Sequence, residues 1–318
     1  MSNPGSSPPA AAPLTAQFAP TEYECWTVED YARRRVARGH RVHRHAGTWW
    51  DQVGTAFCWP LDPLAVLPPR GVRPAWTKSP AGYQHRVAEA AAANSYLNLM
   101  LLEDVPHYAI ERLDSKRRNL VRKGLKGLAV RTPSVEEYRR DGLRVEQEFH
   151  ERTRWKSPPA AAEWPAYVDF SYRDPVIDHK LAAFAGERIV GLLTWFGLER
   201  TAFVTHISSA HDGLKLCAND ALLFTWASLL RDSGQYDRAC FWLRSAKPSL
   251  DQFKAEHLFK PTALAARLVL NPVARLIAAR WKPQHLERLH GLDEAGIRAW
   301  LERKSDGAAD APPAAPSA

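Results

Sequence analysis

The order of apolar and polar segments between residues 134 and 243 most constrains the fold of this chain of 318 residues. A helix is predicted from Ser134 to about Trp155, because apolar residues recur at a spacing near 3.6: Val135, Tyr138, Val145 and Phe149. The stretch LAAFAGERIVGLLTWFGLERTAFVTHISS then predicts three strands separated by two turns, at residues 181–185, 189–196 and 201–208. A helix over about 219–231 and a strand at 238–243 follow. This alternation predicts an α/β fold with a mixed sheet flanked by helices.

The segments on either side of this block have a less regular pattern. In the first half we expect a helix at 27–37, strands around Gly47, a proline-rich extended connection at 59–74, a helix near 82–93 and a strand at 97–102. Towards the C-terminus we expect helices at 249–258, from Asn271 to about Trp281, and at 293–303. Residues 1–20 and 305–318 are rich in Pro, Ala, Ser and Gly, which predicts disordered tails.

Composition limits the classes of protein. The four cysteines form no CxxC pair, which argues against a structural zinc site or a disulfide framework and favours a reducing compartment. No apolar run approaches the roughly 18 residues that a membrane span needs, and the N-terminus lacks a secretory signal. We therefore expect a soluble, cytoplasmic protein. Its formal charge of +8 favours anionic partners.

The most basic segment is RLDSKRRNLVRKGLKG, residues 112–127, with seven positive charges and one negative. At 100° per residue its apolar residues fall within an arc of about 140°: Leu113, Leu120, Val121, Leu125 and Leu128. The cations occupy the rest of the circumference, except Arg117, which lies inside the apolar arc. The pattern predicts an amphipathic helix capped by Asp114 or Ser115 and ended by Gly127, with one buried face and a cationic face outward.

Two segments resemble a known group of proteins. SKRRNLVRKGLKGLAV is similar to the Lys/Arg-rich helix of FemAB-like proteins, and the block from Leu181 to Lys260, including Ser249-Leu250-Asp251-Gln252-Phe253-Lys254, is similar to their GNAT-type domain. The resemblance covers about residues 112–262. It implies a GNAT-like acyltransferase domain at 112–262, a divergent GNAT-like α/β region at 21–111 and C-terminal helices at 263–304.

The resemblance also implies a chemistry, the transfer of an acyl group from acyl-CoA, or of an aminoacyl group from aminoacyl-tRNA, to the amine of a small molecule or peptide. Such a reaction needs a site for the donor phosphates at a helix N-terminus, a polarised carbonyl and a base for the amine. His206 is the candidate base, because its strand runs beside the donor in this fold and imidazole titrates near neutral pH.

Other residues are candidates for binding the donor or the acceptor. Lys215 and Asn219 stand where GNAT domains carry a phosphate-binding loop, although this chain keeps only one Gly and one Lys of that pattern, and Asp212 and Asp220 oppose an anion there. The candidate contacts to substrate or phosphate are Lys116, Arg118, Arg122, Lys123, Lys247 and Lys254. No metal is expected, since no carboxylate or cysteine completes a site near His40, His43 and His45.

Alternative interpretations remain open. The cationic helix could bind RNA, including a tRNA, or the chain could be a non-catalytic GNAT-like protein. The segment after Pro272 places Arg275, Arg280 and Lys282 beside Leu276, Ile277 and Trp281. It could lie on a membrane surface, but Arg280 falls within its apolar stripe, which favours packing on the domain.

Overall fold

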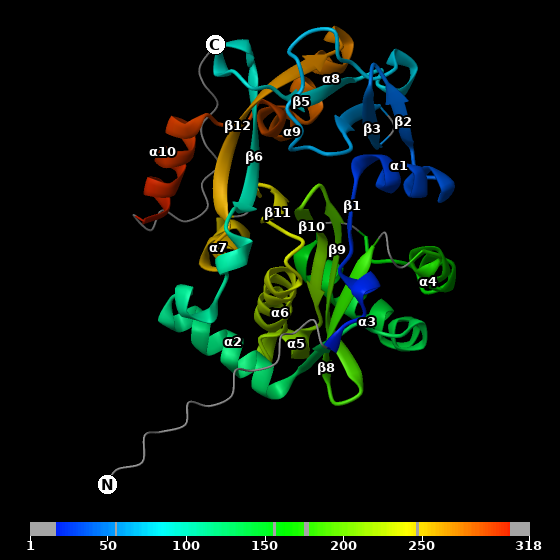
Figure 1. Ribbon diagram of the computed structural model, residues 1–318, viewed down its shortest axis with the longest axis vertical. Helices are drawn as coiled ribbons and strands as arrows, with labels where there is room; N and C mark the ends of the chain where they lie inside the picture. Colours follow the sequence, from blue (N-terminus) through cyan, green and yellow to red (C-terminus); the bar gives the residue numbers. More distant parts are fainter. Residues whose placement is uncertain (1–16, 55, 155–156, 175–177, 246–247, 306–318) are drawn as a thin grey trace.

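The computed structural model describes residues 17–305 except residues 55, 155–156, 175–177 and 246–247 (Figure 1). Its strands form one mixed sheet in the order β2-β3-β4-β5-β12-β6-β11-β10-β9-β8-β7. Strand β1 pairs with the C-terminal end of β9. The strands are β1 (Cys25–Trp26), β2 (Val42–His45), β3 (Thr48–Val53), β4 (Phe57–Pro60), β5 (Gly82–Arg86), β6 (Ser95–Leu102), β7 (Ala129–Arg131), β8 (His179–Ala185), β9 (Arg188–Leu198), β10 (Thr201–Ser209), β11 (Arg238–Leu243) and β12 (Lys260–Leu270).

Helices cover both faces of the sheet (Figure 1). They are α1 (Val28–Ala37), α2 (Ser115–Gly127), α3 (Val135–Thr153), α4 (Trp164–Tyr172), α5 (His211–Lys215), α6 (Ala218–Ser233), α7 (Pro248–Glu256), α8 (Pro272–Trp281), α9 (Pro283–His290) and α10 (Glu294–Ser305). Helix α6 packs on one face of strands β8 to β10, and α3 packs on the other face of β9 and β10. The predicted mixed sheet flanked by helices is confirmed. None of the described helices is both long and apolar enough to cross a bilayer.

The helix–meander–helix–strand order is present as α3, β8 to β10, α6 and β11. Ser134 caps α3 in a capping box with Glu137, which satisfies two backbone amides that the first turn leaves free. Gly234, in the left-handed conformation with φ 64°, ends α6. Helix α4, between α3 and β8, was not predicted. It buries Trp164 and Val168 against α3.

The basic helix α2 has the predicted amphipathic form. The carboxylate of Asp114 caps it by accepting a hydrogen bond from the amide of Arg117, 2.8 Å away. Val121 is fully buried, and Gly124 faces α6 so closely that an added Cβ would lie 2.8 Å from the carbonyl oxygen of Cys217. The small residue at 124 therefore permits close packing of α2 on α6. Leu125, within the predicted apolar arc, is exposed instead.

Two expectations for the flanking segments are wrong. Residues 82–86 form strand β5 rather than the start of a helix, and residues 263–270, expected within a region of C-terminal helices, form most of strand β12. Both errors have one physical cause, because β12 pairs with β5 and with β6 and these pairings join residues far apart in the chain. Phe18, within the expected N-terminal tail, is buried in the core around α6. The division into domains stays a prediction.

Candidate active site

Strands β10 and β11 are parallel neighbours for only three residue pairs, from Thr201–Arg238 to Phe203–Cys240. Beyond them the two strands separate. Trp242 has a left-handed backbone with φ 52°, and the pairing of β11 with β6 shifts register between Cys240 and Leu243. On β10 a bulge between Val204 and His206 shifts the register with β9. A bulge reorients the side chains that follow it, so the position of His206 is set at the point where the strands part.

His206 is held by a buried carboxylate on α3. Its Nε2 lies 3.0 and 2.9 Å from the two carboxylate oxygens of Glu146, and the hydroxyl of Ser208 donates a hydrogen bond of 2.7 Å to the same carboxylate. Glu146 and Ser208 are buried, while the His206 side chain is 30% exposed. The ring of Phe149 packs edge-on against His206. Candidate base, carboxylate and hydroxyl therefore form one cluster, with the imidazole at its accessible side.

Burial acts to raise the pKa of Glu146, but hydrogen bonds from His206 and Ser208, together with the nearby imidazoles of His206 and His150, hold this pKa below its ordinary value. The carboxylate is therefore ionised at neutral pH and can only accept hydrogen bonds. It follows that His206 Nε2 carries the proton of the bond to Glu146. In the neutral ring, Nδ1 is then the basic nitrogen.

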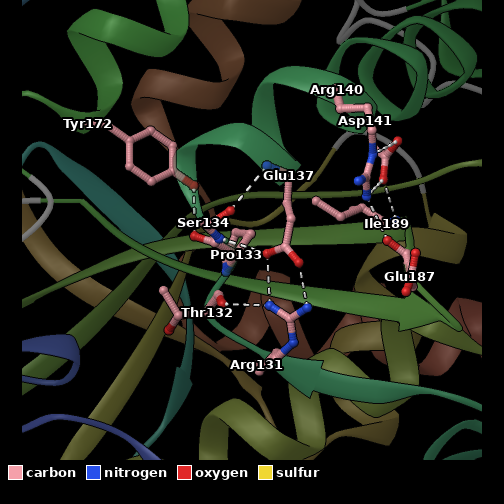
Figure 2. Close-up of polar contacts among 10 residues, drawn as sticks. All are labelled: Arg131, Thr132, Pro133, Ser134, Glu137, Arg140, Asp141, Tyr172, Glu187 and Ile189. Atoms are coloured by element: carbon pink, nitrogen blue, oxygen red, sulfur yellow. Dashed lines mark hydrogen bonds and ion pairs between the residues drawn. The ribbon is translucent and has the colours of Figure 1, made fainter.

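Contacts at the start of α3 fix the position of this helix (Figure 2). Arg131 makes a two-pronged ion pair with Glu137, with N–O distances of 2.8 and 2.6 Å. That pair, followed by the hydrogen bond from the amide of Ser134, lowers the pKa of Glu137 to about 2. One turn later, Asp141 accepts a hydrogen bond of 2.9 Å from the amide of Ile189 on β9. Helix α3 is thus tied to β7 and β9, which places Glu146 opposite β10.

The two candidate donor-binding residues lie around the start of α6. Asn219 is half-buried, and its side-chain oxygen accepts a hydrogen bond from the hydroxyl of Ser209 at the end of β10. Lys215 is exposed at the end of α5. The first amides of an α-helix have no acceptor within the helix, and among the described residues no side chain caps α6. Its first residues are buried or half-buried beside the end of β10.

The two acids expected to oppose an anion at this point are both engaged in ion pairs. Asp212 pairs with Arg188 and Arg144. Asp220 is buried, and it pairs with Arg117 of α2 and with His257. The sequence-based objection to a phosphate at this helix start is therefore weaker than expected, since neighbouring cations compensate both negative charges.

The predicted cationic face of α2 is present. Lys116, Arg122 and Lys123 are exposed and Arg118 is half-buried. Within the described part of the chain, none of these four side chains makes an ion pair or a hydrogen bond. Arg117 differs from them, because it is buried and forms ion pairs with Asp220 and with Glu256 of α7. Arg117, the cation predicted to lie inside the apolar arc, therefore anchors α2 to α6 and α7.

The remaining two candidate lysines differ in placement. Lys247 lies outside the described residues. Lys254, on α7, is buried, and its ammonium group lies 3.4 Å from the carbonyl oxygen of Leu243, 3.6 Å from Asp251 and over the ring of Phe241. Burial lowers the pKa of Lys254, and Asp251 opposes that shift. The lysine thus holds α7 against the end of β11, just beyond the point where β11 separates from β10.

Sequence reasoning missed Glu146, and it discounted Ser208, which together with Ser209, His211 and Asp212 has the residue types of a catalytic triad but stands too close to them in the chain. Glu146 lies beside Val145 at the edge of the apolar stripe of α3, and an acid at such an edge was the one available signal. Ser208 lies two positions after His206 and so shares its face of β10. In the described residues, no group of three or more His, Cys, Asp or Glu is arranged to hold a metal ion.

The arrangement was compared with known proteins. No protein-family model and no curated protein matches the sequence. Among solved structures, FemX superposes with a TM-score of 0.54 at 9% identity, over 78% of this chain and 93% of FemX. L-PGS from Bacillus licheniformis gives 0.46 at 12% identity over 80% and 96% of the two chains. A GCN5-related N-acetyltransferase from Kribbella flavida gives 0.40 at 12% identity over 77% and 95%. At these identities the likeness concerns the fold, and the chain has a GNAT-like fold of the FemX type.

Proposed function

We propose that this protein is an N-acyltransferase, which moves an acyl or aminoacyl group from an activated donor to an amine. One observation carries the proposal: His206, held by the buried carboxylate of Glu146, lies where β10 separates from β11. A base held in place by a carboxylate can remove the proton that an amine loses when it attacks an ester or thioester. The GNAT-like fold supports this proposed function.

In the proposed reaction His206 Nδ1 accepts a proton from the acceptor amine as the nitrogen attacks the donor carbonyl. Glu146 fixes the tautomer and stabilises the imidazolium that forms, as a carboxylate does behind a catalytic histidine. The bulge on β10 leaves Thr205 without a paired residue on β9, and we assign its amide to polarising the donor carbonyl. His206 then returns its proton to the leaving group.

The donor phosphates are assigned to the start of α6. Its free amides and the positive end of its dipole favour an anion, and Lys215 adds a cation nearby. Coenzyme A would supply a thioester whose C–S bond breaks as the C–N bond forms. The compensated charges of Asp212 and Asp220 fit such an occupant. Lys254 is committed to contacts within the protein, and we propose a structural role for it.

The test combines binding and turnover. Acetyl-CoA and longer acyl-CoA thioesters are added singly, and the thermal midpoint is recorded. A ligand at about a hundred times its Kd stabilises by about 2.7 kcal/mol, which is a readily measured shift. Thiol release with a panel of primary amines then measures the reaction. We expect His206→Ala to lower its rate by about 10²–10⁴-fold, whereas His285→Ala, at an exposed position of α9, leaves it unchanged. An absence of any shift or release from the folded protein would overturn the use of coenzyme A.

The face of α2 formed by Lys116, Arg118, Arg122 and Lys123 favours a second donor class. An exposed cationic face without acidic partners suits a polyanion, and we propose aminoacyl-tRNA as the alternative donor. Fluorescence anisotropy with labelled tRNA over a series of salt concentrations tests this. Neutralising Arg118, Arg122 and Lys123 should lower the salt slope by about 0.7–0.9 for each lost phosphate contact. If the protein fails to bind tRNA at low salt, this donor is excluded. Binding without transfer from charged tRNA would instead leave α2 as an RNA-binding element.

A further inference from the structure

Helix α8 carries a large apolar face on which none of the described residues packs. The side chains of Val273, Leu276 and Trp281 are 65%, 73% and 72% exposed, and that of Ile277 is 47% exposed. These positions follow the spacing of one helical face. The sequence favoured packing of this helix on the domain. For its apolar face that expectation is wrong. Only Ala274 and Ala278 of α8 are half-buried, so the helix rests on the protein through its small residues.

Helix α8 is nevertheless held against the sheet by several contacts. The side chain of Asn271 caps it by accepting a hydrogen bond of 2.9 Å from the amide of Val273, and the amide of Asn271 bonds to the carbonyl oxygen of Ala81 beside β5. Helix α9 packs against both α8 and β6, and Gln84 of β5 donates to the carbonyl oxygen of Leu289. The exposed apolar face thus belongs to an ordered helix fixed to the sheet.

The charge on α8 has a single sign. Residues 272–282 contain Arg275, Arg280 and Lys282 and no acid. All three cations are exposed, and within the described residues none of their side chains makes an ion pair or a hydrogen bond. A helix with exposed Trp, Leu, Ile and Val beside unpaired cations has the composition of helices that lie in the interface of an anionic bilayer. We propose that α8 is a membrane-docking helix that binds an anionic lipid surface.

Two other occupants fit the face less well. A contact between two copies of α8 would bury Arg280 in an apolar interface to which α8 itself contributes no acid, and a buried charge without a partner is costly. The terminal segments of this chain offer little to cover the face, since residues 1–16 contain only Met1 and Leu14 as large apolar residues and residues 306–318 contain none. On a membrane, Arg280 instead extends its long side chain to the headgroups while Trp281 lies at the interface.

Docking through α8 orients the protein. Helix α8 and the basic helix α2 lie at opposite ends of the molecule (Figure 1). Helix α2 therefore lies far from a membrane that α8 contacts. This separation makes the two basic regions distinguishable in an experiment, because charge removal at one end should leave the other end unchanged.

The experiment measures co-sedimentation of the full chain with vesicles of phosphatidylcholine alone and of equal parts phosphatidylcholine and phosphatidylglycerol. We expect binding to the anionic vesicles and much weaker binding to the neutral ones. Replacing Leu276 and Trp281 together by serine should weaken binding at least tenfold, because their insertion provides most of the apolar contact. Replacing Arg275 and Lys282 by glutamine should weaken it about fivefold for each charge lost, from about 1 kcal/mol per cation near an anionic surface.

Two controls separate docking through α8 from nonspecific adsorption to vesicles. Arg122→Gln with Lys123→Gln removes two charges from α2, and Tyr167→Ser removes an exposed aromatic side chain from α4. Both variants should bind vesicles like the original protein. The proposal is overturned if the α8 variants bind as well as the original chain, or if the α2 variant alone abolishes binding. It is equally overturned if the protein does not bind vesicles and light scattering shows a dimer. In that case the double variant Leu276→Ser with Trp281→Ser should dissociate the dimer.

Discussion

Replacing Arg117 by methionine tests how α2 is attached to the rest of the protein. Arg117 is buried, and its guanidinium forms ion pairs with Asp220 of α6 and Glu256 of α7 while lying over the ring of Phe253. Methionine keeps most of the apolar stem but removes the charge. Among the side chains that the structure describes, Asp220, also buried, would then retain the contact with His257 alone, at 3.3 Å. Removing one partner of a buried pair leaves an uncompensated charge, which costs about 3–5 kcal/mol.

Urea unfolding followed by circular dichroism measures this cost. At a slope of about 3 kcal/mol per molar of urea, the midpoint should fall by roughly 1 M or more. Arg118→Met, on the same helix and without an ion pair in the described structure, should change the free energy of unfolding by no more than about 0.5 kcal/mol. Equal losses of stability in the two variants would refute the anchoring role of Arg117. Partial recovery of the loss by Asp220→Asn and Glu256→Gln in the Arg117→Met background would support it further.

The same network sets a pH dependence. Burial acts to raise the pKa of Asp220, but hydrogen bonds from His257 and Arg117 hold it below its ordinary value. The stability that Asp220 contributes is therefore present above about pH 4 and is lost as pH falls through its lower folded pKa. In Arg117→Met this acid-labile contribution should be smaller, so the unfolding midpoint should fall less steeply with acid than in the original chain.

Three further predictions concern stability. Gly124→Ala should destabilise by about 1–3 kcal/mol, because its Cβ would press on the start of α6, whereas Gly127→Ala, with open space around it, should be neutral or slightly stabilising in thermal unfolding. Burial lowers the pKa of His179 to about 4, so the free energy of unfolding should fall by about 3 kcal/mol as pH falls from about 6.5 to about 4. Unfolding midpoints measured over this range should show the loss in His285→Gln and not in His179→Phe. Ser134→Ala should cost about 1 kcal/mol in urea unfolding through loss of the α3 cap, and an unchanged midpoint would contradict that role.

Local patterns in the sequence predicted the elements that depend on neighbours along the chain. The spacing of apolar residues and the caps at Asp114 and Ser134 predicted α2 and α3, and the turns predicted the β8 to β10 meander. Contacts between distant residues account for what was missed. Arg117 lies in the apolar arc because its acidic partners come from α6 and α7, and Glu146 becomes a site residue only when α3 packs on β10. A single sequence does not show which of its distant residues will pair.

Strand β12 has a consequence for how this chain reaches its fold. It lies between β5 and β6 although it is made more than 150 residues after β6. Until residues 260–270 leave the ribosome, both of those strands lack the partner between them, and an unpaired strand edge favours wrong association. The first half therefore cannot finish folding before the second half is made. Pairing over such sequence distances also slows folding, so the nascent protein should depend on chaperones more than its compact core implies.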